Sequence, residues 1–359
     1  MTTGARKQNT GKNKSALRKS AWGRLTAGSQ GLSFRKLQQA SILILLVILC
    51  VFASFRIPTF LTWTNLVDNL LTNAAALGVV ALGMTFIMIG GGFDLSVAST
   101  IVVCSVVLVM GMDWLSPYGA AVAIPVALLL TVLVGVILGA INGTLVAYIG
   151  VNPFVATLCT MLIFRGIAQI LTGGGQTQQV HDILLRRRFD WFYDAGLRLC
   201  GGCGISMPIL IFLVVFAVGI YLLRFTRFGH YVYAIGGNEE AVWLAGVNTH
   251  RIKALTYVLG GFTCAIAAVI FVAKTETAGA ESHMGKELVV IASVIVGGTP
   301  LGGGSGGLAA TVIGLLLLRV IDNLLTQFSI GPEYRPVVTG LIILVVVIVD
   351  VLAKRRSST

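Results

Sequence analysis

Three charged side chains stand inside long apolar runs, where an ion is costly and is normally kept for function or for a specific pairing. Arg165 lies in one run, and Arg319 and Asp322 lie three residues apart in another. At that spacing two side chains share one face of a helix and can form an ion pair. Such a pair can hold helices or subunits together, or it can face the path of a polar solute. Asp322 is also the one acid placed where a proton-coupled carrier would need it.

Other reactive residue types show no catalytic or metal-binding pattern. The four His and six Cys have no ligand spacing, and no paired carboxylates occur at helical spacing, so we expect neither catalytic residues nor a metal site. A membrane-embedded enzyme is therefore the weakest functional alternative. Cys200 and Cys203, in the stretch CGGC, could form a disulfide or remain two loop thiols.

The composition indicates that these residues sit in a membrane protein. Of 359 residues, 56% are apolar and only 11% are charged, whereas a soluble domain carries about 25% charged residues. A spanning helix needs roughly 17 to 25 mostly apolar residues, and we expect an all-α polytopic protein with about ten transmembrane helices. The predicted spans are 40–56, 69–90, 95–112, 119–140, 152–172, 207–224, 252–273, 286–298, 307–329 and 336–353. The eighth is too short to cross unaided and is predicted to be tilted or broken.

The net charge of +12 is concentrated at the chain ends, which argues against a nucleic-acid partner. Residues 1–40 hold nine Lys or Arg and no acid, and the chain ends on Lys354-Arg355-Arg356. The positive-inside rule then places both termini in the cytoplasm. We expect a disordered basic tail at 1–40 rather than a secretory signal peptide. The predicted membrane domain is 41–353, with an outer loop at 173–206 and a cytoplasmic loop at 224–253, and a tail follows at 354–359.

Two glycine-rich segments separate predicted spans. In the first, Gly91 and Gly92 can end one helix, and Asp94, followed by Ser96, can cap the next. The second, 297–307, contains Gly297, Gly298 and Thr299 and is predicted to act as a hinge with close helix packing. It is not a phosphate cradle, because the chain has no GxxxxGK[ST] pattern. The two segments share a Gly-Gly-x-x-Leu core and are predicted on the same face of the membrane.

The loop 224–253 carries charges of both signs. Asn238 can cap a short helix with Glu239 and Glu240 in its first turn, and Gly246 can end it. By itself this pattern fits a solvated helix at the membrane interface.

These segments, taken together, resemble the permease subunits of bacterial ABC importers for monosaccharides, the ribose permease group. The resemblance covers roughly residues 65 to 352. The matching strings are GGFDLSVAS, YAIGGN, VGGTPLGGGSGG and NGTLVAYIGVNPFVATLCTMLIFRG. The chain departs from the group at Phe93, usually Ile, at Ala98, usually Gly, and at Trp243, often Arg.

The resemblance implies import of a pentose, hexose or related polyol across the bacterial inner membrane. It makes the loop a coupling helix that docks into a separate ATPase subunit, through Gly237, Asn238, Glu239, Glu240, Ala241, Ala245 and Gly246. ATP and Mg would be held by that partner, with no cofactor on this chain. Further implied partners are an extracytoplasmic sugar-binding protein, a second permease copy and membrane lipids. The alternative from a different class is an ion-coupled secondary carrier that works without an ATPase, which the charged loop disfavours.

Overall fold

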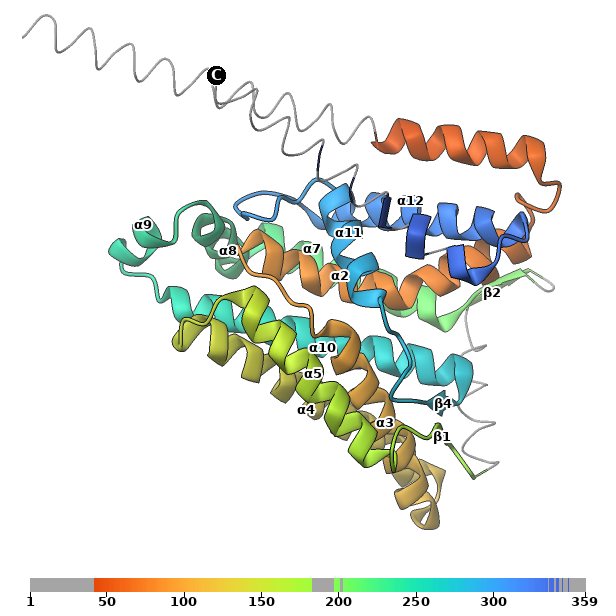
Figure 1. Ribbon diagram of the computed structural model, residues 1–359, viewed down its shortest axis with the longest axis horizontal. Coiled ribbons are helices and arrows are strands. Elements are labelled where there is room, and N and C mark those ends of the chain that lie inside the picture. The colour runs from red at the N-terminus through yellow and green to blue at the C-terminus, as the bar shows by residue number, and fades with distance from the viewer. Residues whose placement is uncertain are drawn as a thin grey trace, which may run out of the picture.

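A computed structural model describes residues 42–182, 197–200, 203–334, 336–338, 340–341, 344 and 348. The described chain is a bundle of helices (Figure 1). Within these residues, seven helical segments are long and apolar enough to cross a membrane. They are Thr64–Ile89, Val97–Tyr118, Ala120–Tyr148, Pro153–Leu171, Met207–Phe225, Thr249–Thr275 and Leu308–Gln327. The expectation of an all-α, multi-spanning protein is confirmed.

The seven segments coincide with seven of the ten predicted spans. The first predicted span forms the shorter helix Ile42–Arg56, and the eighth forms α11 (Lys286–Val296), which has 11 residues and is short, as expected. Most of 336–353, both predicted tails and the middle of the loop 173–206 lie outside the described residues.

The spanning segments combine α-helices with short stretches of other helix. The first joins η1 (Thr64–Leu71), a π-helix, to α2 (Thr72–Ile89). The next contains α3 (Val97–Leu115) and the 3-10 turn η2 (Ser116–Tyr118), and α4 (Ala120–Gly143) continues into η3 (Thr144–Tyr148). The others are α5 (Pro153–Leu171), α7 (Met207–Phe225), α10 (Thr249–Thr275) and α12 (Leu308–Gln327). The predicted second span began at residue 69, because the Asn and Asp residues of η1 hid its start.

The core is built on α2, which is buried on almost all sides. Within its most apolar window 89% of residues are buried, against 17% for α7, so α2 is central and α7 is peripheral. Small residues let α10 approach its neighbours closely. On α4, Gly135, Gly139 and Gly143 recur every four residues, and each packs against the backbone of α10. The sequence thus sets a close, side-chain-free contact between α4 and α10.

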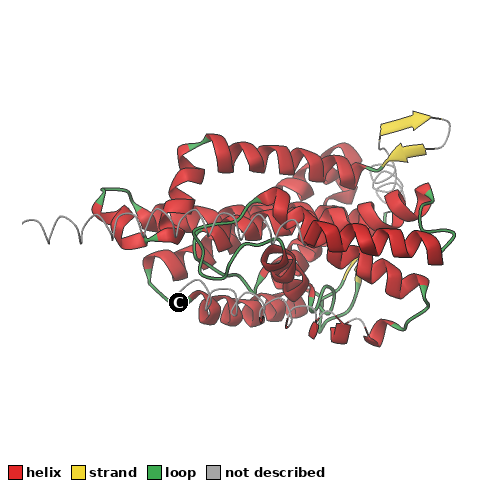
Figure 2. Cartoon of the chain, turned by 90° about the horizontal axis from the view of Figure 1, so that it is seen from above, coloured by secondary structure: helices red, strands yellow, loops and turns green. Residues whose placement is uncertain are grey.

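The two ends of the bundle differ. One end carries two short antiparallel pairs, β1 (Gln178–Gln179) with β4 (Thr277–Ala278), and β2 (Leu197–Cys200) with β3 (Cys203–Ile205). The second pair projects from the bundle in Figure 2, and its register places the backbones of Cys200 and Cys203 opposite each other. The other end carries α8 (Arg227–Gly237) and α9 (Glu239–Leu244), between α7 and α10 (Figure 1).

Candidate functional site

The loop 224–253 is largely helical. α9 begins at Asn238, whose Oδ1 accepts a hydrogen bond from the N–H of Ala241 at 2.9 Å. The predicted cap and short helix are therefore confirmed, and Gly246, with φ of +84°, follows the helix as predicted. The preceding helix α8 was not predicted, because Gly disfavours helix by about 1 kcal/mol per residue. Packing stabilises it instead, through a buried face of Gly229, Val232 and Ile235.

The α9 helix presents an apolar tip. Trp243 and Leu244 are 59% and 72% exposed. At its start, Glu239 pairs with Lys253 of α10 at 2.8 Å, so this carboxylate fixes α9 on the bundle. Exposed large apolar residues on a projecting element are typical of a contact with another protein. The departure at Trp243 thus adds apolar area at the predicted docking helix.

Three glycine segments meet where α8 ends. The N–H of Gly304 donates to the carbonyl of Ile89 at 2.8 Å. A Cβ at Gly236 would come closer than 3.0 Å to both of these backbones, and one at Gly303 would stand 2.6 Å from the nitrogen of Gly91. We call this contact between residues 89–92, 236–237 and 302–304 the glycine junction. The predicted placement of the two glycine-rich segments on one face is confirmed here, and the end of α8 joins them.

A second contact links α8 to the glycine-rich segment 297–307. The Tyr233 hydroxyl donates to the carbonyl of Gly306 at 2.9 Å. Burial raises the pKa of Tyr233, against a smaller lowering effect of Arg224, so the phenol stays neutral and can donate.

The predicted hinge residues of this segment are tightly placed. Gly297 follows α11 and packs on the backbone of Ala310, and Gly298 has φ of +89°. Thr299 is buried, and its hydroxyl makes no hydrogen bond to the described residues.

Asp94 does not cap α3 directly, which corrects the prediction. Helix α3 starts after Ser96, and the Asp94 carboxylate accepts from the Ser96 N–H at 2.8 Å and from its hydroxyl at 2.7 Å. The Ser96 hydroxyl also accepts from Asn142 of α4 at 2.7 Å, and all three side chains are buried. The sequence motif therefore joins the α2–α3 connection to α4 inside the protein.

Tyr257 of α10 also holds the connection between α2 and α3. The Tyr257 hydroxyl accepts from the N–H of Phe93 at 3.2 Å and donates to its carbonyl at 3.0 Å. A side chain at Gly92 would collide with this hydroxyl. Gly91 has φ of +77°, which L side chains rarely adopt. Both glycines are required for this backbone path.

The predicted intramembrane charges have two different surroundings. Arg165 of α5 donates to the carbonyl of Ala280 at 2.6 Å, so it holds the connection between α10 and α11. Arg319 and Asp322 form the predicted pair at 3.2 Å. The pair lies within α12, and both residues also line a cavity.

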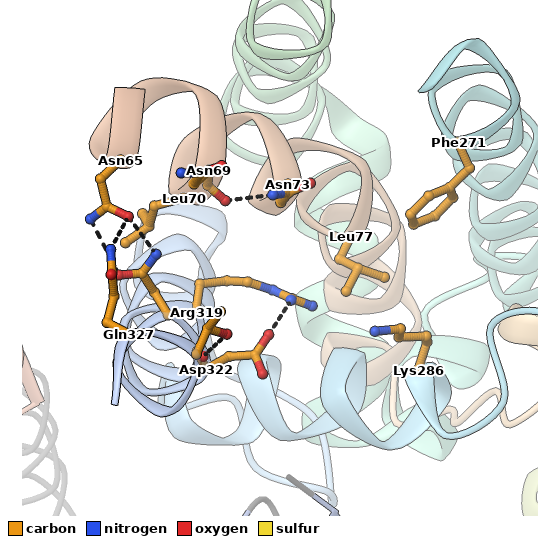
Figure 3. A pocket seen from close by; sticks show the side chains of 12 residues that line it. Asn65, Asn69, Leu70, Asn73, Leu77, Phe271, Lys286, Arg319, Asp322 and Gln327 are labelled. Carbon is orange, nitrogen blue, oxygen red and sulfur yellow. Dashed lines mark hydrogen bonds and ion pairs between the residues drawn. The ribbon is translucent and has the colours of Figure 1, made fainter. Parts of the chain in front are cut away.

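The cavity has a volume of about 470 Å³ and lies between η1–α2, α10, α11 and α12 (Figure 3). Small-molecule pockets usually measure about 300–1,000 Å³. Most lining side chains are polar, and Leu70, Leu77 and Phe271 add apolar surface. The polar ones are Asn65, Asn69, Asn73, Lys286, Arg319, Asp322, Asn323, Thr326 and Gln327. The arrangement can hold a polar solute within the membrane domain.

The sequence predictions missed the asparagines of this cavity. Asn65, Asn69 and Asn73 recur every four residues, a spacing that places them along one side of a helix. The signal was present, but it lies across the expected start of a span. It could have been found by searching for polar periodicity at the edges of apolar runs.

A family model described as "Branched-chain amino acid transport system / permease component" matches residues 66–347. The chain belongs to this permease family. The ribose import permease protein RbsC of Escherichia coli K12 is 35% identical over 321 residues, which cover 88% of this chain and 94% of that protein. RbsC of Haemophilus influenzae is 36% identical, over 86% of this chain and 91% of the relative. The L-arabinose transport system permease protein AraH of Escherichia coli K12 is 32% identical, over 89% and 93%. No solved structure matches.

These relatives confirm the predicted resemblance to the ribose permease group and the expectation of a permease subunit that performs no bond chemistry. Both the relatives and the apolar helices support a multi-pass protein of the bacterial inner membrane. In this permease the glycine junction and the polar cavity are the two features that the geometry offers for transport.

Proposed function

We propose that this chain is the membrane-spanning subunit of an ATP-binding-cassette importer that moves a monosaccharide. The relatives are import permeases for ribose and L-arabinose, so a pentose, a hexose or a related polyol is the expected substrate class. An extracytoplasmic binding protein would deliver the sugar. A separate ATPase subunit would bind ATP and Mg and supply the energy. A second permease copy would complete the path through the membrane.

The observation that carries the coupling part of this proposal is the glycine junction. At Gly236 the end of α8 touches the backbones of both glycine-rich segments, with no side chain between them. A push on α9 can therefore reach α2, α11 and α12 through backbone contacts, which are stiffer than contacts through flexible side chains. This connection supports the assignment of Gly237–Gly246 as the region that responds to the ATPase.

The end of the bundle that carries α8 and α9 is assigned to the cytoplasm. Arg224, Arg227, Arg251 and Lys253 lie at this end, as the positive-inside rule requires. Both termini would then be cytoplasmic, and the end with the short strands would face the binding protein.

The experiment that tests the proposal is isolation of the tagged chain with its partners. The protein would be extracted from its own host in mild detergent, and bound proteins would be identified by mass spectrometry. We expect an ATPase with a Walker A motif to copurify. The double variant Trp243→Glu/Leu244→Glu should lose the ATPase, because both side chains lie at the exposed tip of α9.

The matched control is Trp114→Glu. Trp114 is 77% exposed, and its neighbour Asp113 binds His181 next to β1, at the opposite end of the bundle from α9. The control variant should keep the ATPase at wild-type abundance. Retention of the ATPase by the α9 variant would overturn the assigned docking surface. Purification of the wild-type chain without any ATPase, under several mild conditions, would overturn the importer assignment.

A further inference from the structure

Two polar stripes face each other across the cavity of Figure 3. On η1 and α2 the stripe consists of Asn65, Asn69 and Asn73, and on α12 it runs from Arg319 to Gln327. Polar groups at this depth of a membrane protein are costly unless they have a task. Some of these side chains hold the helices together, and the others point to a bound solute.

One end of the cavity is held by amide contacts. Asn65 accepts from Asn323 and from Gln327, both at 2.9 Å, and donates to the carbonyl of Phe60 at 3.0 Å. Asn65 is buried, so these bonds clamp η1 onto the end of α12. This cluster forms a wall of the cavity.

The remaining polar side chains surround the cavity itself. Asn69 is exposed on η1, one turn from Asn65, and Lys286 projects from the start of α11 (Figure 3). Arg319 and Asp322 supply a donor and an acceptor from α12. The ring of Phe271, against which His283 packs, adds aromatic surface to the lining. Mixed donors and acceptors together with an aromatic ring match a sugar, which has hydroxyls at its edge and C–H groups on its faces.

We propose that this cavity is a sugar-binding site of the permease, occupied during transport, with Asn69 and the Arg319–Asp322 pair as the hydroxyl-binding groups. The proposal rests on the proposed function, and it adds a substrate contact within this chain to the selectivity expected of the binding protein.

The cavity is also connected to the glycine junction. α2 carries Leu77 in the cavity and ends at Ile89 in the junction. α11 begins at Lys286 in the cavity and leads into the 297–307 segment, from which α12 returns to Arg319. Three helices thus extend from the sugar site toward the contact that receives the push from α8. Movement at the junction changes the width of the cavity.

The test compares two neighbouring positions on η1. Asn69 lines the cavity, whereas Asp68 is exposed but does not line it. In the complete complex, Asn69→Cys and Asp68→Cys would be modified by a small charged methanethiosulfonate. The modification would be followed by mass spectrometry on the peptide with the new cysteine, which separates it from the native thiols. D-ribose, L-arabinose, a hexose and a polyol are the probes. Uptake of each by the wild type and by both cysteine variants is measured first, and the half-saturating concentration used below is that of Asn69→Cys.

The proposal expects protection by the transported sugar at residue 69 alone. At ten times its half-saturating concentration, a bound sugar leaves the site free about one-eleventh of the time, so modification slows about tenfold. The rate at residue 68 should stay unchanged, and modification at 69 but not at 68 should block uptake. If Asn69→Cys transports a probe while residue 69 is modified at the same rate with and without that probe, the cavity assignment is wrong and the importer function stands. If the wild type takes up none of the probes, the proposed function fails and this inference fails with it.

Discussion

The substitution Gly236→Ala tests whether the glycine junction couples α8 to the membrane helices. Gly236 is the last but one residue of α8, and an added Cβ would stand about 1 Å inside the 3.0 Å limit for real Cβ contacts, against the Ile89 carbonyl and the Gly304 nitrogen. Both obstacles are backbone, so neither can rotate away. The end of α8 must therefore separate from one or both glycine-rich segments.

The cost follows from the two opposing effects of this substitution. Overpacking against fixed neighbours costs about 1–3 kcal/mol, whereas Gly→Ala within a helix gains up to about 1 kcal/mol. The net penalty of about 1–2 kcal/mol acts on the contact itself and leaves the core of the bundle unchanged. Since each 1.4 kcal/mol corresponds to a factor of about ten, we expect ATP-driven sugar uptake to fall about five- to twenty-fivefold.

Gly166 of α5, outside both the glycine junction and the docking region, supplies the control. A Cβ at Gly166 meets nothing within 4 Å, so Gly166→Ala gains helix propensity without a collision. Both variants would be reconstituted with their partners in proteoliposomes at equal abundance, and uptake of labelled sugar and ATP hydrolysis would be measured. Gly166→Ala should transport within about twofold of the wild type. Wild-type uptake by Gly236→Ala would refute the coupling role of the junction.

Three further predictions concern other contacts. Gly139→Val should prevent stable insertion of the permease, because Gly139 packs on the backbone of α10. The control Gly166→Val should insert normally, since nothing lies within 4 Å of a Cβ at Gly166. Equal abundance of both variants in the membrane would contradict the packing argument. Glu239→Lys should abolish uptake at normal abundance, since the partly exposed Glu239–Lys253 pair contributes only about 0.5 kcal/mol to stability. The exchange Glu239→Lys/Lys253→Glu should not restore uptake, and full rescue would mean that Glu239 acts through Lys253 alone. Burial, then Lys286 and Arg165, lower the pKa of His283 to about 4 from 6.5. The neutral form of His283 stabilises the folded state fully above pH 6.5, and this stabilisation is lost as the pH falls toward 4. Between pH 7 and 5 the free energy of unfolding should fall by about 2 kcal/mol on account of this residue. The variant His283→Asn, which tolerates the positive φ at this position, should show less acid sensitivity in thermal unfolding, and an unchanged pH profile would contradict this.

The membrane helices were largely predictable, since hydrophobic length alone locates them. Seven predicted spans became long apolar helices, and the short eighth became α11. The edges were predicted less well. The helix before α2 starts at Thr64, ahead of the predicted start at residue 69. The early start was missed because Asn65, Asp68 and Asn69 lower the local hydropathy of η1. Such residues resemble a loop in sequence. In the structure Asn65 is bonded to Asn323 and Gln327 of α12, a contact that only the tertiary packing reveals.

The candidate site was predictable in its parts but not in its connections. The short helix after Asn238 followed from local capping rules. The importance of Gly236 over Gly237 depends on which backbone lies opposite, and that is set by tertiary packing between segments far apart in the chain. The same holds for Asp94, whose carboxylate could satisfy several nearby groups and whose actual network includes Asn142 of another helix.

The central claim is that an ATPase, coupled through α9 and the glycine junction, drives sugar movement through this permease. The most direct measurement is uptake of labelled sugar into proteoliposomes that contain the permease, its ATPase and the binding protein. The account predicts uptake that requires ATP on the α9 side and continues when ionophores dissipate all ion gradients. Uptake that collapses with ionophore, and proceeds without ATP or the ATPase, would contradict the account and identify an ion-coupled carrier.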